Sequence, residues 1–188
     1  MNLTTKNAAL ILIDLQKGWD NHAHWGGNRN NPNAENVTLE LLMEWREKKL
    51  PIFHIIHGSK DLNSELHPSK PGFEILDALK PLKNEPLLIK NVNSAFIGTD
   101  LQERLEKAAI NTLVIAGLTT NHCVSTTTRM AGNFGFEVYL VSDATATFDR
   151  KGLNGEVFPA EVIHQTALAS LNEEFATVLD KATLFELL

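Results

Sequence analysis

Residues 111–130 read NTLVIAGLTTNHCVSTTTRM, and this stretch predicts a strand that passes directly into a helix. Residues 113–116 are apolar and partly β-branched, which is typical of a buried strand. A glycine ends the run, and Thr119 or Thr120 is a suitable N-cap for the helix that follows. Cys123 would then lie in the first helical turn, where unpaired backbone N–H groups and the helix dipole favour a thiolate.

Cys123 is the only cysteine in the chain. A single cysteine is often a small buried hydrophobic residue, so its position leaves both a structural and a nucleophilic interpretation open. One cysteine cannot form an internal disulfide, which favours the reducing environment of the cytoplasm.

Apolar runs of strand length alternate with helical patterns along the whole chain. The predicted strands are 8–13, 51–57, 86–89, 113–116, 136–141 and 175–178, and the main predicted helices are 36–49, 100–109, the Cys123 helix, 160–171 and 181–188. Residues 73–79 predict one or two further helical turns. Because continuous apolar strands separated by helices indicate a parallel sheet, we expect an α/β fold. The expected architecture is a three-layer, doubly wound, Rossmann-like sheet of about six mainly parallel strands with helices on both faces. We expect residues 1–188 to form one domain.

Composition excludes several classes of function. The 188 residues are 43% hydrophobic, and the formal net charge of −6 comes without a basic stripe, so we expect no nucleic-acid partner. The longest apolar runs are far too short to cross a bilayer, and the start of the chain does not resemble a signal peptide. We therefore expect a cytoplasmic protein with no membrane partner.

Reactive residues stand at the ends of three predicted strands. Asp14 ends the first strand, Lys90 ends the third, and Cys123 follows the fourth after a short turn. Parallel sheets bind ligands at the carboxyl ends of their strands, so these side chains are expected to meet at one edge. A carboxylate, an ammonium and a thiol together would form a nucleophilic site. Taken alone, Asp14 could cap a turn and Lys90 could be a solvated strand end.

Two long polar loops follow the first two strands, over residues 16–33 and 58–72, and loops of this length are often functional. We expect Trp19, His57, Asn93 and Phe96 to contact the substrate, because each lies at a strand end or in an adjoining loop. The alternative interpretation of Phe96 is a core residue.

Several motifs, in order over nearly the whole chain, resemble the isochorismatase-like, or cysteine hydrolase, superfamily. They are Leu12-Ile-Asp-Leu-Gln16, Ile89-Lys90, Ser94-Ala-Phe-Ile-Gly-Thr-Asp-Leu101, Gly117-Leu-Thr-Thr120, Cys123-Val124, Val141-Ser-Asp-Ala144, and Glu161 with His164. The Asn-rich loop between Trp25 and Asn36 also resembles the subset related to streptothricin hydrolase.

The resemblance implies a catalytic triad of Asp14, Lys90 and Cys123. Asp14 would take the thiol proton, Lys90 would stabilise the anions, and the Cys123 thiolate would attack an amide carbonyl to form a thioester. The backbone N–H groups of Thr119 and Cys123 would form the oxyanion hole. The resemblance also implies a cis peptide bond between Leu118 and Thr119.

Nicotinamidases of this superfamily hold a metal ion through an Asp-x-His motif and a further histidine. The corresponding region here contains His54, His57, Asp61 and His67 without that motif, so we expect no metal and no other cofactor. His54 and His57 are three residues apart in a strand, so they point to opposite faces and cannot share a site while the strand is extended.

The function expected from these observations is hydrolysis of a non-peptide carbon–nitrogen bond in a small amide or cyclic lactam. One alternative is an isochorismatase-type enol-ether hydrolase, whose acid catalysis needs no cysteine. The other is a thiol-based redox or binding protein, although no second cysteine could resolve an oxidised thiol. We expect a homo-oligomer, since the apolar residues 184–188 are compatible with an interface, although they could instead pack on their own sheet.

Overall fold

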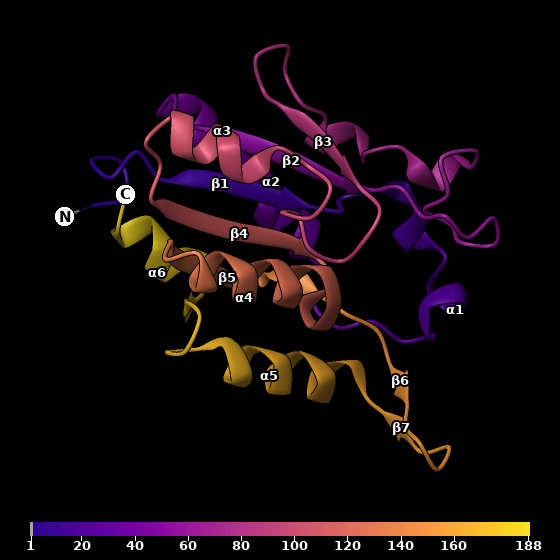
Figure 1. Ribbon diagram of the computed structural model, residues 1–188. Helices are drawn as coiled ribbons and strands as arrows, with labels where there is room; N and C mark the ends of the chain where they lie inside the picture. Colours follow the sequence, from indigo (N-terminus) through magenta and orange to yellow (C-terminus); the bar gives the residue numbers. More distant parts are fainter. Residues whose placement is uncertain (1) are drawn as a thin grey trace.

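Six parallel strands form the central sheet of the computed structural model, which describes residues 2–188 (Figure 1). They are β1 (Ala9–Ile13), β2 (Ile52–His57), β3 (Leu87–Lys90), β4 (Thr112–Leu118), β5 (Glu137–Ala146) and β8 (Thr177–Leu179). Their order is β3-β2-β1-β4-β5-β8, and every neighbouring pair is parallel. From β1 the chain adds β2 and β3 in one direction, and from β4 it adds β5 and β8 in the opposite direction. The topological switch point, where such sheets bind ligands, therefore lies between β1 and β4.

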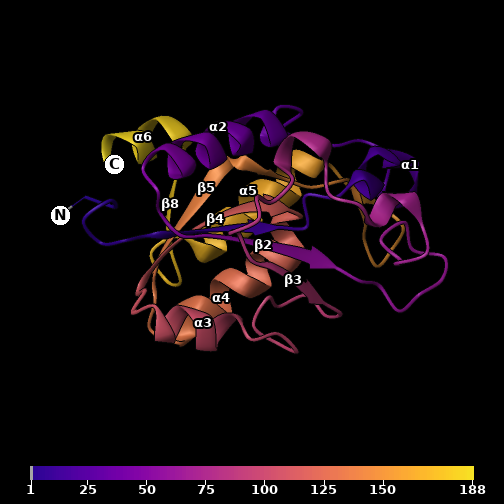
Figure 2. The same ribbon diagram turned by 90° about the horizontal axis from the view of Figure 1, so that it is seen from above.

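Helices cover both faces of the sheet (Figure 2). Helices α2 (Ala34–Glu47) and α6 (Lys181–Glu186) pack against one hydrophobic core. Helices α3 (Leu101–Lys107), α4 (Ser125–Asn133) and α5 (Ala160–Leu171) pack against a second core on the other face. Strand β1 is buried throughout, and its side chains alternate between the two cores. This explains why its sequence is continuously apolar.

The predicted α/β fold with parallel strands and helices on both faces is confirmed, and several local predictions need correction. Residues 73–79 do not form an α-helix; the connection between β2 and β3 contains two short 3₁₀ turns, η2 (Pro71–Phe73) and η3 (Asp77–Leu79). Pro71 and Pro81 flank residues 73–79 and lack the N–H groups that would extend a helix there.

Four short elements were not predicted from the sequence. They are the 3₁₀ turn η1 (Lys17–Asp20), helix α1 (His22–Trp25), and the strands β6 (Arg150–Lys151) and β7 (Val157–Phe158) of an antiparallel hairpin. The hairpin projects from the body of the molecule beside the start of α5 (Figure 1). Within residues 2–188, no helix is long and apolar enough to span a membrane.

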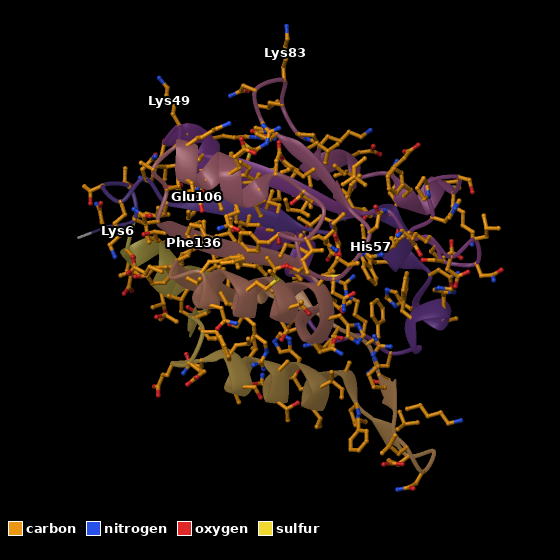
Figure 3. All side chains as sticks on the ribbon, in the orientation of Figure 1. Lys6, Lys49, His57, Lys83, Glu106 and Phe136 are labelled. Carbon is orange, nitrogen blue, oxygen red and sulfur yellow. The ribbon has the colours of Figure 1, made fainter. Side chains whose placement is uncertain are left out.

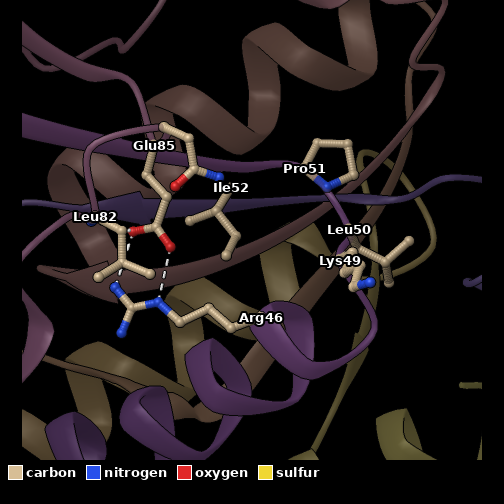
Figure 4. Close-up of a pocket in the computed structure, with 8 residues that line it drawn as sticks. Arg46, Lys49, Leu50, Pro51, Ile52, Leu82 and Glu85 are labelled. Carbon is tan, nitrogen blue, oxygen red and sulfur yellow. Dashed lines mark hydrogen bonds and ion pairs between the residues drawn. The ribbon is translucent and has the colours of Figure 1, made fainter.

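A buried carboxylate ties the edge of the sheet to α2, far from the strand ends that carry Asp14 and Cys123. Arg46 donates to Glu85 through Nε and one terminal nitrogen, at 2.7 and 2.8 Å, beside a cavity of about 310 Å³ (Figure 4). The His54 ring and the Leu82 N–H complete the contacts of Glu85, each at 2.9 Å. Burial acts to raise the pKa of Glu85, but these hydrogen bonds lower it to about 2.

We expect Glu85→Gln to lower the free energy of unfolding at pH 7 by about 3 kcal/mol, because it leaves Arg46 without its buried partner. The native pKa of Glu85 lies below its ordinary value of 4.5, so ionisation of Glu85 stabilises the fold above that pH. The difference between variant and wild type should therefore shrink as the pH falls from 4.5 towards 2. Urea denaturation across this range measures it.

Glu103→Gln is the matched control, because Glu103 forms an exposed ion pair with Lys107 within one helix. It should cost less than about 0.5 kcal/mol at any pH. Equal destabilisation by the two variants would show that the buried contacts of Glu85 stabilise the fold no more than an exposed ion pair does.

Candidate active site

The three reactive residues at the strand ends converge at the switch point of the sheet. Asp14 directly follows β1, Lys90 ends β3, and Cys123 lies in a π-helical turn, η4 (Thr120–Val124), between β4 and α4. His57 ends β2 at the same edge, at the opposite end of the molecule from Lys6 (Figure 3). Cys123 is thus not at the start of a regular α-helix, and no threonine side chain caps the turn.

The ammonium group of Lys90 lies at the centre of this site. It donates to Asp14 Oδ2 at 2.7 Å and to Cys123 Sγ at 3.2 Å, and it lies 3.2 Å from His57 Nδ1. Asp14 and Lys90 are fully buried, whereas 7% of the Cys123 surface is exposed. The predicted meeting of carboxylate, ammonium and thiol is therefore present in the structure.

Backbone geometry at the end of β1 places the Asp14 carboxylate. Asp14 adopts a left-handed conformation with φ of 52°, which turns the chain out of the strand. Its N–H donates to Ile55 O at 2.8 Å, and the Trp19 indole N–H donates to its carbonyl. On the neighbouring strand, Gly117 has φ of 126°, and a Cβ there would lie 2.0 Å from Ile13 O. Only glycine permits this approach of β4 to β1.

The turn that carries Cys123 is anchored from both sides. The Leu118–Thr119 peptide bond is cis, as the resemblance implies. The Thr120 hydroxyl contacts His164 Nδ1 at 2.9 Å, and Asn31 of the Asn-rich loop contacts the other ring nitrogen at 3.4 Å. His164 thus links α5, the Asn-rich loop and the turn.

Burial determines the protonation of the thiol at rest. Burial and the neighbouring Asp14 charge raise the pKa of Cys123, and Lys90 offsets only part of this effect. The prediction of a favoured thiolate is therefore wrong for the resting protein, because desolvation outweighs the field of the turn. Burial alone would lower the pKa of Lys90, but the charge of Asp14 and the hydrogen bonds to Asp14 and Cys123 raise it, so the ammonium stays charged.

A cavity of about 310 Å³ opens above the thiol. Trp19, His57 and Asn93, three of the four predicted substrate contacts, line it together with Thr119 and Cys123. Phe96 is placed elsewhere: it packs against Phe134 and Phe136 in the core beside α4. The remaining lining residues, which were not among the predicted substrate contacts, are His24, Trp25, Ser59, Asp61, Ser64, Leu66 and His122. All but His122 lie in the two long polar loops, so loop length was the signal for them.

His122, next to the thiol in sequence, contacts a cation of the projecting hairpin. One terminal nitrogen of Arg150 lies 2.8 and 3.3 Å from the two ring nitrogens of His122. A position close to both nitrogens lies over the ring rather than in its plane. Burial and the Arg150 charge lower the pKa of His122 to about 4, so the imidazole facing the cavity is neutral at pH 7.

The residues of the site do not fit a metal ion. His54 contacts Glu85 and His67 contacts Ser69, so the histidines around β2 are not gathered together. Among residues 2–188, the side chains of Asp14, His57 and Cys123 form the one cluster of ligand atoms close enough to share an ion. The Lys90 ammonium already contacts all three of these side chains, and a metal cation there would meet its charge.

Comparison with known proteins identifies the family of this chain. The family model that describes the isochorismatase domain matches residues 8–183 of this chain. The chain belongs to the isochorismatase family.

Several relatives and one solved structure support this membership. An uncharacterised isochorismatase family protein of Bacillus subtilis, YrdC, is 48% identical over 91% of this chain and 90% of its own length. Nicotinamidase 3 of Arabidopsis thaliana is 30% identical over 94% of this chain and 86% of its own length. A crystal structure of an isochorismatase-family protein from Chromobacterium violaceum superimposes with a TM-score of 0.93, at 38% identity over 100% of this chain and 96% of that one.

Streptothricin hydrolase of Streptomyces noursei is similar at lower identity, 27% over 90% of this chain and 67% of its own length. Relatives of this isochorismatase-family protein thus include a nicotinamidase and a streptothricin hydrolase, and its Asp14, Lys90 and Cys123 arrangement fits a cysteine hydrolase.

The electrostatics of the site predict opposite effects of its two charges on the thiol. Asp14→Asn removes a charge that raises the thiol pKa, so alkylation of Cys123 by iodoacetamide should accelerate about tenfold at pH 8. Lys90→Met removes the charge that lowers this pKa, so alkylation should slow by a similar factor. Alkylation rates measured between pH 6 and 10 give, for each variant, the pH at which the rate is half of its maximum, which reports the ionisation of the thiol. Equal midpoints would mean that neither charge is coupled to the sulfur.

Proposed function

We propose that this protein hydrolyses a non-peptide carbon–nitrogen bond in a small amide or lactam, with Cys123 as the nucleophile. The observation that carries the proposal is the contact of one buried ammonium with both a carboxylate and a thiol, of which the thiol lines a cavity. The three groups supply what acyl transfer needs: a base, a nucleophile and a fixed positive charge.

The reaction begins from the protonated thiol. Asp14 accepts the thiol proton as Cys123 attacks the carbonyl carbon, and the charge of Lys90 stabilises the anion that forms. The N–H groups of Thr119 and Cys123 bind the oxyanion; Thr119 and Cys123 both line the cavity. Asp14 then protonates the leaving nitrogen, so that ammonia or an amine departs and a thioester remains.

Water completes the cycle. Asp14, again a carboxylate, removes a proton from water, and the hydroxide adds to the thioester carbonyl. Collapse of this second intermediate breaks the carbon–sulfur bond, releases the carboxylic acid and returns the proton to the thiolate. Asp14 thus acts twice as base and twice as acid, with no cofactor taking part.

The cavity lining supports a planar or cyclic substrate without negative charge. Trp19 and Trp25 lie against each other, with ring centroids 4.3 Å apart, and offer aromatic surface. No lysine or arginine lines the cavity. The enol-ether alternative requires isochorismate, which carries two carboxylates, and nothing on these walls would neutralise them. A nicotinamide-like amide or a streptothricin-like lactam suits these walls better.

We also propose that the chain is a single cytoplasmic domain that assembles into a homo-oligomer. The closing segment does not support an interface, because Leu184 is fully buried and Phe185 packs against the core of its own chain. Exposed apolar side chains on the β6–β7 hairpin, including Leu153 and Val157, favour an interface there instead. Sedimentation velocity checks the assembly state, and a monomer at micromolar concentration would contradict it.

A screen for ammonia release across small amides and lactams tests the proposed reaction. Cys123→Ala should reduce turnover by about 10⁴-fold or more, because no other group can form the thioester. Hydroxylamine added during turnover should yield a hydroxamate, and mass spectrometry should find an acyl group on Cys123.

The control is His67→Asn, a half-buried loop position outside the cavity, which should retain full activity. Turnover that survives Cys123→Ala would remove the nucleophile. Pyruvate release from isochorismate would support the enol-ether alternative, and peroxide-dependent dimerisation without turnover would support the redox alternative.

A further inference from the structure

The Lys90 ammonium has one acceptor for each of its protons, and one of these acceptors lies outside the proposed triad. An ammonium group carries three N–H donors and no acceptor. Asp14 Oδ2, Cys123 Sγ and His57 Nδ1 lie 2.7, 3.2 and 3.2 Å from Lys90 Nζ. The lysine is fully buried, so water does not compete for these donors.

This contact determines the state of the His57 ring. Because the ammonium can only donate, His57 Nδ1 must carry a lone pair, and the proton of the neutral ring is on Nε2. Burial and the Lys90 charge both lower the pKa of His57, so the neutral ring is the dominant form at pH 7. A protonated ring would place two cations in contact.

His57 is itself held in place by the sheet and by a buried glutamine. His57 and Lys90 are register partners on β2 and β3, so their side chains leave the sheet on the same side. Gln16 Oε1 accepts from the His57 N–H at 2.8 Å, and Gln16 Nε2 donates to the His57 carbonyl at 3.1 Å. The imidazole therefore approaches Lys90 from a fixed backbone.

We propose that His57 is a positioning residue, whose neutral imidazole accepts the third ammonium proton of Lys90 and holds the cation between Asp14 and Cys123. This inference rests on the proposed function and replaces the expected role of His57 as a substrate contact. Without this acceptor, the ammonium turns towards Asp14, its strongest partner, and the sulfur loses part of the positive charge that lowers its pKa.

Two substitutions at His57 separate positioning from substrate contact. In His57→Asn, the amide oxygen occupies roughly the place of Nδ1 and can accept from Lys90. In His57→Leu, no acceptor remains. We expect the leucine variant to lose about 10–100-fold in kcat with little change in KM, and the asparagine variant to recover most of it. His67→Asn is the control for loss of an imidazole outside the cavity.

The alkylation of Cys123 by iodoacetamide provides a readout that needs no substrate. His57→Leu should raise the pH midpoint of alkylation and slow the reaction about tenfold at pH 8, whereas His57→Asn should stay near the wild type. This holds even if no amide is turned over, so failure of the proposed function is distinguishable from failure of the positioning role. An unchanged midpoint in the leucine variant, identical effects of the two variants, or a change confined to KM would overturn the proposal.

Nitrogen NMR of the unmodified protein provides a test that needs no folded leucine variant. With ¹⁵N-histidine labelling, and His57→Asn to assign the signal, His57 should show an unprotonated Nδ1 and a protonated Nε2 at pH 7.5. A proton on Nδ1 would exclude the contact with the ammonium and with it the proposal.

Discussion

A buried ammonium group is the constraint on which the rest of the molecule depends. Removing a lysine from water costs several kcal/mol unless its charge and its protons find partners. Lys90 finds them in Asp14, Cys123 and His57, which come from the ends of β1, β4 and β2. Four of the six strands must therefore end at the same level, which ties the register of most of the sheet to the chemistry at its edge.

The same burial explains why Cys123 rests as a protonated thiol rather than as a reactive thiolate. An exposed thiol beside a lysine would ionise readily, but at Cys123 desolvation and the Asp14 carboxylate keep the proton on sulfur. Since the thiolate is the form that reacts with oxidants, a thiol that keeps its proton is protected from adventitious oxidation.

Much of the framework could be predicted from the sequence because buried parallel strands have a distinct pattern. The positions of Asp14 and Lys90 at strand ends then implied their meeting. The side chains of the long loops could not be placed, since no periodicity fixes where Trp25 or Asp61 lies. In the sequence, Phe96 looks the same whether it lines a pocket or packs in the core. Only its contacts with Phe134 and Phe136 show that it belongs to the core. The His57–Lys90 contact depends on register, which sequence patterns do not specify.

The Asn-rich loop is bound to the site more tightly than its polar composition suggests. Asn31 donates to the carbonyls of Ser142 and Thr145 and also reaches His164, which holds the turn of the nucleophile through Thr120. Loop remodelling is the usual route by which a hydrolase scaffold acquires new substrates. Here such divergence must leave Asn31 in place, because its displacement would release His164 and with it the turn that carries the cysteine.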